Sequence, residues 1–394
     1  MSGIGIIAEF NPLHNGHEYL ISEAKKHGTV VCILSSNFVQ RGDTAIAEKR
    51  IRTLSALKAG ADLVLELPVL WSMSTAQNFA LGAVSGLMYA GCEKIMFGSE
   101  CGDITELLKT AQILYSPEFS KSVADKLKSG VTFAATRQSA AEELGVKSGI
   151  LEGANNNLGI EYILAAKALN YNVTFETVTR LGAMHDSLEE AEFVSASLLR
   201  EKLKENDFDF CKKYISEDIL ALLKTESISD IKNIETAILA VLRSKTAEDF
   251  KNLPDLSEGI ENKLFSSISL ATNLNELYNT IKVKRYTLAR IRRLVLSAFL
   301  GLSNEFFMKP LHYLRPLGFN SRGEVFLKNS FKSCPVPIIN RIADIEKLSP
   351  NAKRVFETEA RSTDLYLLSL NKPQKCGLEY TSKIIKEECS KWLQ

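Results

Sequence analysis

The residues best suited to chemistry lie near the start of the chain, in the segment Glu9–His17 with the sequence EFNPLHNGH. Two of the five histidines of the chain, His14 and His17, stand there in an HxGH pattern. Two imidazoles beside a polyphosphate can donate hydrogen bonds to oxygens that gain charge as a P–O bond breaks. Gly16 lets the backbone approach a ligand closely. The pattern therefore predicts phosphate chemistry, with His14 and His17 as the catalytic residues.

A strand and a helix must position this segment. Ile4–Ala8 is an apolar run typical of a buried strand, and residues 15–27 are predicted to form a helix. Ligands of parallel sheets bind beyond the carboxyl ends of the strands, and a helix N-terminus offers phosphate free N–H groups and a positive dipole end. This context favours a nucleotide site over two loop histidines without a role. A metal site is disfavoured, because no third ligand accompanies the pair.

A second candidate for phosphate contact lies just before residue 200. Ser195 is predicted to cap a helix over residues 197–205, and Ser197 and Arg200 can reach phosphate oxygens from the start of that helix. The alternative is an ordinary capped helix with a surface arginine. The HxGH pattern elsewhere in the chain favours phosphate contact.

Short strands alternate with helices through the first half of the chain. The predicted strands are Ile4–Ala8, Thr29–Leu34, Leu63–Leu67, Glu93–Phe97 and Tyr171–Val178. Beyond about residue 200, helical patterns dominate, at 197–205, 216–225, 231–246, 258–270 and 284–301, and the last twenty residues suit a terminal helix. We predict an α/β protein with a Rossmann-like parallel sheet, covered on both faces, in a domain of residues 1–205. A mainly helical domain of residues 206–394 follows.

Composition excludes several classes of protein. The 394 residues are 45% hydrophobic, which excludes low-complexity disorder, and 48 basic against 47 acidic side chains argue against a globally basic nucleic-acid binder. Seven cysteines without a CxxC pair argue against a disulfide framework or a cysteine zinc site. The N-terminus lacks the basic region of a signal peptide, and the longest uncharged stretch, Leu67–Cys92, is too polar for a membrane helix. We expect a cytoplasmic protein with no membrane partner.

One local basic patch stands out in the second half. Residues 282–293 hold six basic and no acidic side chains. The six are Lys282, Lys284, Arg285, Arg290, Arg292 and Arg293. A helix with one basic face suits contacts to RNA phosphates, and the alternative is a solvated amphipathic helix. The near-zero net charge elsewhere favours RNA contact.

The motifs together resemble a known family. EFNPLHNGH resembles the HxGH signature of the nucleotidyltransferase superfamily, and VSASLLR at Val194–Arg200 is similar to its second, ISSTxIR-like signature. Four further segments narrow the resemblance to the tRNA(Met) cytidine acetate ligases, over the whole chain. They are FVQRG at 38–42, DLVLELP at 62–68, NNNLGIEY at 155–162 and RLG at 180–182.

This resemblance implies an ATP-dependent ligase that works in two steps. Acetate attacks the α-phosphate of ATP to give acetyl-adenylate, and the acetyl group then passes to N4 of the wobble cytidine of elongator tRNA(Met), giving N4-acetylcytidine. ATP is then a co-substrate, Mg²⁺ is expected with it, and no tightly bound cofactor or dedicated protein metal site is implied. The alternative is a small-molecule adenylyltransferase of the same superfamily that makes a nucleotide cofactor. The oligomeric state is left open.

The resemblance also implies site residues by position. The implied ATP-binding residues are Ile7, Ala8, Glu9, Phe10, Asn11, Pro12, His14, Gly16, His17, Leu20, Gly102, Asn155, Arg180, Leu181, Ser195, Ser197 and Arg200. Gln40 and Arg41 are placed on the acetate or acceptor side, with a solvated turn as the alternative. Two positions depart from the family pattern, Ala154 in place of a proline and Met184 in place of an aromatic residue.

Overall fold

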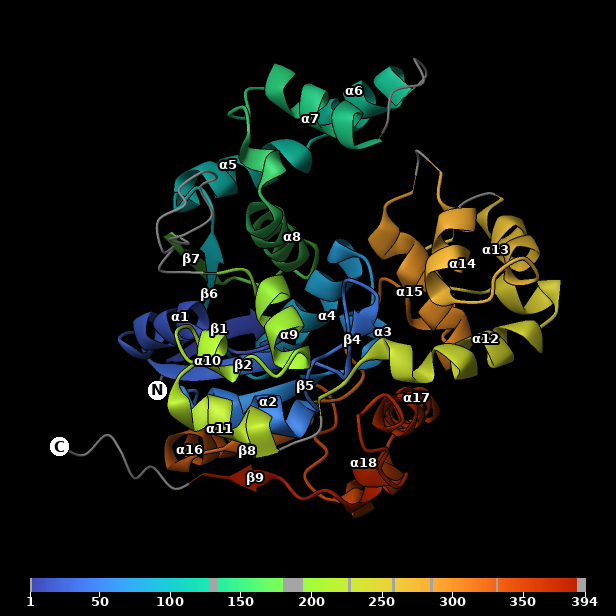
Figure 1. The fold of residues 1–394 in the computed structure, drawn as a ribbon. Helices are drawn as coiled ribbons and strands as arrows, with labels where there is room; N and C mark the ends of the chain where they lie inside the picture. Colours follow the sequence, from blue (N-terminus) through green and yellow to red (C-terminus); the bar gives the residue numbers. More distant parts are fainter. Residues whose placement is uncertain are drawn as a thin grey trace.

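A seven-stranded sheet runs through the middle of the molecule (Figure 1). The structure is a computed structural model that describes residues 2–127, 133–179, 194–225, 228–256, 259–283, 286–330 and 332–387. In spatial order the strands are β7 (Thr174–Thr179), β6 (Lys94–Ser99), β1 (Gly3–Ala8), β2 (Thr29–Ser35), β5 (Leu63–Leu67), β8 (Pro316–Phe319) and β9 (Ile385–Lys386). The five strands that the first half contributes to this sheet run parallel to one another, so their carboxyl ends meet at one edge.

Two hydrophobic cores cover the two faces of the sheet, because side chains alternate along each strand. In β2, Val31 and Ile33 enter one core, while Cys32 and Leu34 enter the other. The first core includes residues of α4 (Ala76–Tyr89), α5 (Ile104–Leu114), α8 (Ala154–Ala168), α16 (Ser321–Ser330) and α17 (Pro350–Leu367). The second includes residues of α1 (Asn15–Lys25), α2 (Lys49–Lys58), α9 (Ala196–Lys204), α10 (Phe208–Cys211) and α11 (Glu217–Thr225). The predicted α/β fold with a covered parallel sheet is confirmed.

A third core lies beside the sheet, among helices of the second half (Figure 1). These are α12 (Glu235–Arg243), α13 (Ile260–Ile268), α14 (Leu274–Ile281) and α15 (Leu288–Leu300), drawn in yellow and orange. Helix α17 joins two cores, because Phe356 packs against the sheet and Tyr366 packs into the third core. The shorter α3 (Val69–Ser72) and α18 (Leu378–Thr381) also contact α17, and α6 (Pro117–Leu127) packs on α7 (Phe133–Glu143). No helix within the described ranges is long and apolar enough to cross a membrane.

The division into domains at residue 205 stays a prediction, and the sheet crosses it. Strands β8 and β9 come from the second half, with β8 antiparallel to β5 and β9 parallel to β8. Helix α11 also packs on the sheet, since Ile219 lies in the same core as Ile6. The terminal helix expected for the last twenty residues is wrong at Ile385–Lys386, which form β9, and residues 388–394 lie outside the described chain.

Candidate active site

The HxGH segment links the end of β1 to the start of α1. His14 is the N-cap of α1, and its Nδ1 accepts the N–H of Gly16 at 3.1 Å. His17 completes a capping box, because its Nδ1 accepts the N–H of His14 at 3.4 Å. The two ring centroids are 3.9 Å apart. A neutral imidazole that accepts at Nδ1 carries its proton on Nε2, so both rings can present Nε2–H as a donor.

The first N–H groups of α1 already have partners. Asn15 donates to the carbonyl of Tyr214 at 2.8 Å, and His17 and Glu18 donate to the carbonyl of His14 at 2.7 and 3.1 Å. The expectation of free N–H groups for phosphate is therefore wrong at these positions, because the carbonyls of Tyr214 and His14 accept them. The positive end of the helix dipole remains at this point.

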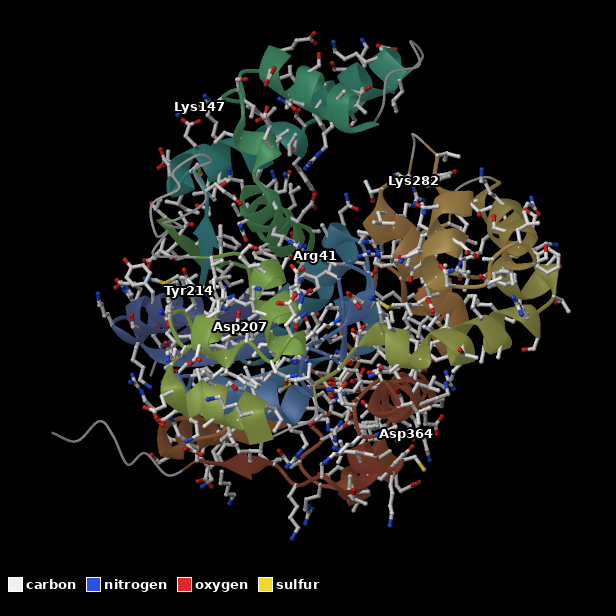
Figure 2. The ribbon with its side chains drawn as sticks, viewed as in Figure 1. Arg41, Lys147, Asp207, Tyr214, Lys282 and Asp364 are labelled. Carbon is white, nitrogen blue, oxygen red and sulfur yellow. The ribbon has the colours of Figure 1, made fainter. Side chains whose placement is uncertain are left out.

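The start of α9 lies against the HxGH segment and against the loop after β2. Ser195 caps α9 as predicted, since its Oγ accepts the N–H of Leu198 at 3.3 Å. Arg200 donates from Nη1 to the carbonyl of Asn11 at 2.7 Å and from Nη2 to Oγ of Ser197 at 3.0 Å. Arg41, labelled in Figure 2, donates to the same Oγ at 3.2 Å. Two guanidinium groups thus converge on one hydroxyl, and Arg200 also contacts the segment that carries the paired histidines.

Charges in this cluster shift one another. Glu9 is partly buried and accepts the N–H of Gln40 on Oε1 at 2.9 Å. Burial raises the pKa of Glu9, although the nearby Arg200 and Arg41 oppose that shift. Burial and the like charge of Arg41 lower the pKa of Arg200. An anion between two repelling guanidinium groups would relieve their repulsion, so the arrangement suits phosphate.

A third loop follows β6, the neighbour of β1 in the sheet. Glu100 accepts the N–H and the side-chain amide of Asn155 on Oε1 at 3.0 and 2.7 Å, and the N–H of Asn156 on Oε2 at 2.7 Å. Burial alone would raise the pKa of Glu100, but the hydrogen bonds from Asn155 and Asn156 lower it. Gly102 has a φ of +63°, and a Cβ there would lie 2.0 Å from Oγ1 of Thr179. The tight turn therefore requires the glycine.

The other residues predicted for ATP mostly build the framework of the segment. Ile7, Ala8, Phe10, Pro12 and Leu20 are buried. Asn11 is buried as well and accepts the N–H of Ile46 at 2.7 Å. Arg180, Leu181 and the departure at Met184 lie outside the described residues. The departure at Ala154 falls on the first residue of α8.

The predicted basic face is partly occupied by partners. Asp255 pairs with Nη2 of Arg290 at 3.3 Å and with Nη2 of Arg293 at 3.2 Å, and these arginine side chains are 23% and 14% exposed. Arg292 lies over the ring of Tyr278. Lys282 is exposed at the end of α14 and is labelled in Figure 2. Lys284 and Arg285 lie outside the described residues.

Arg52 is a buried framework residue that the sequence motifs do not indicate. Only 2% of it is exposed, and it donates to the carbonyls of Glu9, Ser35 and Ser36 at 2.8, 3.0 and 2.8 Å. It thereby joins the chain just beyond β1 to the end of β2. These partners lie 16 to 43 positions away in the chain, so no local pattern indicates these contacts.

Three buried glutamates bring their carboxylates close enough together to be a candidate metal site. Glu66, Glu359 and Glu379 are buried, and one oxygen of each lies within 4.8 Å of the others. Nζ of Lys49 already occupies the centre, at 2.5 Å from Glu66 and 2.6 Å from each of the other two. The group is a buried ion-pair network that ties α17 and α18 to the end of β5, and it does not suit a metal ion.

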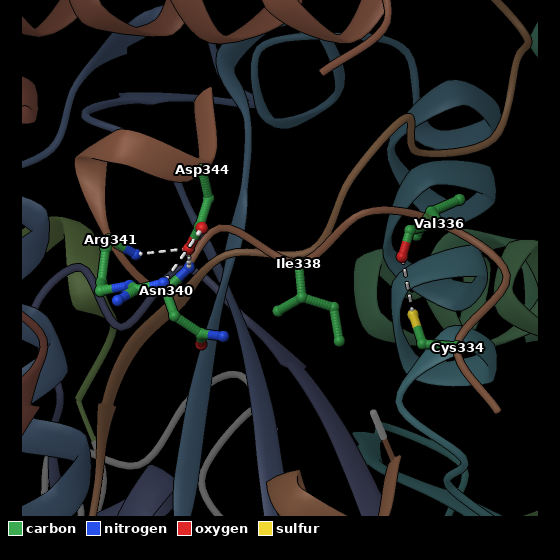
Figure 3. Close-up of a pocket in the computed structure, with 6 residues that line it drawn as sticks. All are labelled: Cys334, Val336, Ile338, Asn340, Arg341 and Asp344. Carbon is green, nitrogen blue, oxygen red and sulfur yellow. Dashed lines mark hydrogen bonds and ion pairs between the residues drawn. The ribbon is translucent and has the colours of Figure 1, made fainter. Parts of the chain in front are cut away.

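A cavity of about 470 Å³ lies elsewhere and shares no residue with the paired histidines (Figure 3). It is lined by Cys334, Val336, Ile338, Asn340, Arg341 and Asp344. Oδ2 of Asp344 accepts the N–H of Arg341 at 3.0 Å, and Sγ of Cys334 contacts the carbonyl of Val336. Its polar groups therefore stabilise their own loop.

Comparison with known proteins agrees with this geometry. A family model described as HIGH Nucleotidyl Transferase matches residues 1–380. Together, the fold and this match define a nucleotidyl transferase. A relative from Thermoanaerobacter sp. (strain X514) is 36% identical over 408 residues, covering 98% of this chain and 100% of the relative. Another from Caldanaerobacter subterraneus subsp. tengcongensis is 37% identical over 403 residues, with the same coverage. Both are named tRNA(Met) cytidine acetate ligase, and the chain belongs to that family.

Solved structures match over nearly the whole chain. Thermotoga maritima TmcAL bound with alpha-thio ATP is 28% identical, with a TM-score of 0.90, and the match covers 98% of this chain and 100% of that one. The apo form of the same protein is 29% identical with a TM-score of 0.91 and equal coverage.

Proposed function

We propose that this protein is an ATP-dependent RNA-modifying ligase. It activates acetate as acetyl-adenylate and transfers the acetyl group to N4 of the wobble cytidine of elongator tRNA(Met). The strongest support within the chain is the capping box, which orients His14 and His17 so that each can donate from Nε2. Relatives named tRNA(Met) cytidine acetate ligase and a solved relative bound with alpha-thio ATP support the same activity.

In the first step, a carboxylate oxygen of acetate attacks the α-phosphorus of ATP. The bond between that phosphorus and the bridging oxygen breaks, and pyrophosphate leaves with the electron pair. Nε2–H groups of His14 and His17 would stabilise the charge that develops on the leaving oxygens. Arg41 and Arg200 would hold the phosphates in line, since guanidinium groups pair well with phosphate oxygens.

In the second step, N4 of the cytidine attacks the acetyl carbonyl of the adenylate. The bond from the carbonyl carbon to the AMP oxygen breaks, AMP leaves, and N4 loses a proton. Gln40 and Arg41 lie on the loop after β2, where the acetate and the acceptor base would approach. Lys282 and Arg292 are proposed to contact RNA phosphates, because Arg290 and Arg293 already pair with Asp255.

Mg²⁺ is proposed to enter with ATP, held by the phosphates and by water. The one group of three carboxylates found among the described residues holds Lys49 instead of a metal ion. No step of the proposed reaction depends on a metal ligand from the chain.

The first step is tested by the exchange of labelled pyrophosphate into ATP. The proposal predicts exchange that requires acetate and is lost in H17A. Exchange that does not require acetate but requires a mononucleotide or phosphopantetheine would instead identify a small-molecule adenylyltransferase.

A further inference from the structure

The turn that carries Arg41 is held from both sides at a single residue. The strands β3 (Phe38–Val39) and β4 (Asp43–Thr44) form a small hairpin after β2. At its tip, the N–H of Gln40 donates to Oε1 of Glu9 at 2.9 Å. The carbonyl of Gln40 accepts Nη1 of Arg293 at 3.1 Å. One support therefore comes from the HxGH segment and the other from α15.

The same turn packs directly on the backbone of α15. Gly42 has a φ of +71°, a conformation that side chains rarely adopt. A Cβ on Gly42 would lie 2.6 Å from Cβ of Arg292 and 2.7 Å from the backbone nitrogen of Arg293. No side chain fits between the turn and α15, so the two backbones are in direct contact at Gly42.

Arg293 is itself held in place. Its Nη2 donates to Oδ2 of Asp255 at 3.2 Å, and the side chain is 14% exposed. Asp255 also pairs with Arg290. Burial lowers the pKa of Arg293, while the charge of Asp255 opposes that shift. With one arm on Asp255 and the other on Gln40, this guanidinium is oriented toward the protein and away from an RNA phosphate.

The hydrogen bond of Arg41 to Ser197 is not enough to hold the Arg41 side chain in place. Arg41 donates to Oγ of Ser197, which Arg200 also approaches, so two like charges meet at one hydroxyl. Their repulsion favours separation, and the hydroxyl bears no charge to offset it, although Glu9 and Asp43 attract Arg200 from nearby. The backbone of the turn must therefore keep Arg41 in place.

We propose that Arg293 is a positioning residue for the nucleotide site, acting through the carbonyl of Gln40 to keep Arg41 beside Ser197 and Arg200. The proposal rests on the proposed function, because it takes ATP as the ligand of that site. In this role Arg293 does not contact RNA, in contrast to the prediction from the basic run at residues 282–293. Misplacing a positioned group by about 1 Å can cost about a hundredfold in rate.

The test compares R293Q and R293K with the wild-type full chain in acetate-dependent pyrophosphate exchange without tRNA. We expect R293Q to raise KM for ATP and to lower kcat/KM about 10- to 100-fold. R293K should recover part of the loss, since Nζ can reach one of the two acceptors. A merely structural defect would lower the active fraction, and so the apparent kcat, while leaving KM for ATP unchanged.

R243Q is the matched control, because Arg243 of α12 also donates to a backbone carbonyl, that of Ala271, within the helices of the third core. It should leave KM for ATP unchanged. Affinity for tRNA and its salt dependence should be the same in R293Q as in the wild type. If R293Q keeps its KM but the salt slope falls by about one, Arg293 is an RNA contact and the proposal is wrong.

Two other results are distinguished from a failure of the positioning role: an inactive wild-type protein and an R293Q variant that does not fold. Wild-type protein without any acetate-dependent exchange would refute the proposed function and not the geometry of the turn. If R293Q does not fold, D255G takes its place, because it removes the carboxylate that holds the other arm of Arg293 and suits the φ of 60° at that position. A normal KM for ATP in a folded D255G protein would overturn the positioning role.

Discussion

Two substitutions of His14 distinguish the roles of the two nitrogens of its ring. Nδ1 accepts the capping bond from Gly16 at 3.1 Å, which leaves Nε2 as the proposed donor to the leaving phosphate. Asparagine places its oxygen near the position of Nδ1, whereas glutamine places its amide nitrogen near the position of Nε2. H14N should therefore keep the cap and lose the donor, and H14Q should keep the donor and lose the cap.

The loss of the cap and the loss of the donor differ in free energy. An N-cap bond contributes about 1 kcal/mol, and asparagine is among the best capping residues. Removing one donor to a developing oxyanion costs about 100- to 1,000-fold in rate, or about 3 to 4 kcal/mol. We expect H14N to be as stable as the wild type but at least about 100-fold slower. H14Q should keep most of the rate and lose about 1 kcal/mol in the stability of α1.

Pyrophosphate exchange with acetate measures the rate, and hydrogen exchange of the first turn of α1 measures the cap. A loss of about 1 kcal/mol speeds amide exchange there about fivefold. H14A should show both defects. If H14N is faster than H14Q, the assignment of the proton to Nε2 is wrong. Equal rates in both variants would show that His14 does not donate to the leaving group.

Three further predictions concern residues around the site. In G102A, the new Cβ would clash with Thr179, so thermal unfolding should show a loss of more than about 1 kcal/mol. K49M leaves its three glutamate partners buried without their cation and should cost about 3 to 5 kcal/mol in denaturant unfolding. Burial and Glu379 raise the pKa of Glu48 from 4.5 to about 7. The folded protein then binds the extra proton between those values, so stability falls as the pH rises through that window, and E48Q should flatten this fall in melting temperature.

The five strands that the first half contributes to the large sheet could be predicted, because each is a short run rich in apolar or β-branched residues. Leu63–Leu67 has the predicted bounds, and β2 extends the predicted Thr29–Leu34 by one residue. Strands β8 and β9 could not be found in this way. They have four and two residues, and they form only because the chain returns to the edge of β5. Such pairing depends on tertiary contacts and leaves little periodicity in the sequence.

The histidine pair could be found because it is contiguous with its strand and helix. The contact of Arg41 with Ser197 spans 156 positions, and that of Arg293 with Gln40 spans 253, so neither leaves a local pattern. The basic run shows the same limit. The number of charges in the basic run can be read from the sequence, but the pairing of Asp255 with two of them cannot.

The most direct test of the proposed activity follows the acetyl group into RNA. The protein is incubated with ATP, labelled acetate and total tRNA, and the tRNA is digested to nucleosides. The account predicts label in N4-acetylcytidine only when ATP and acetate are both present, and incorporation at least about 100-fold slower with H14N. Consumption of ATP without any label in tRNA would contradict it.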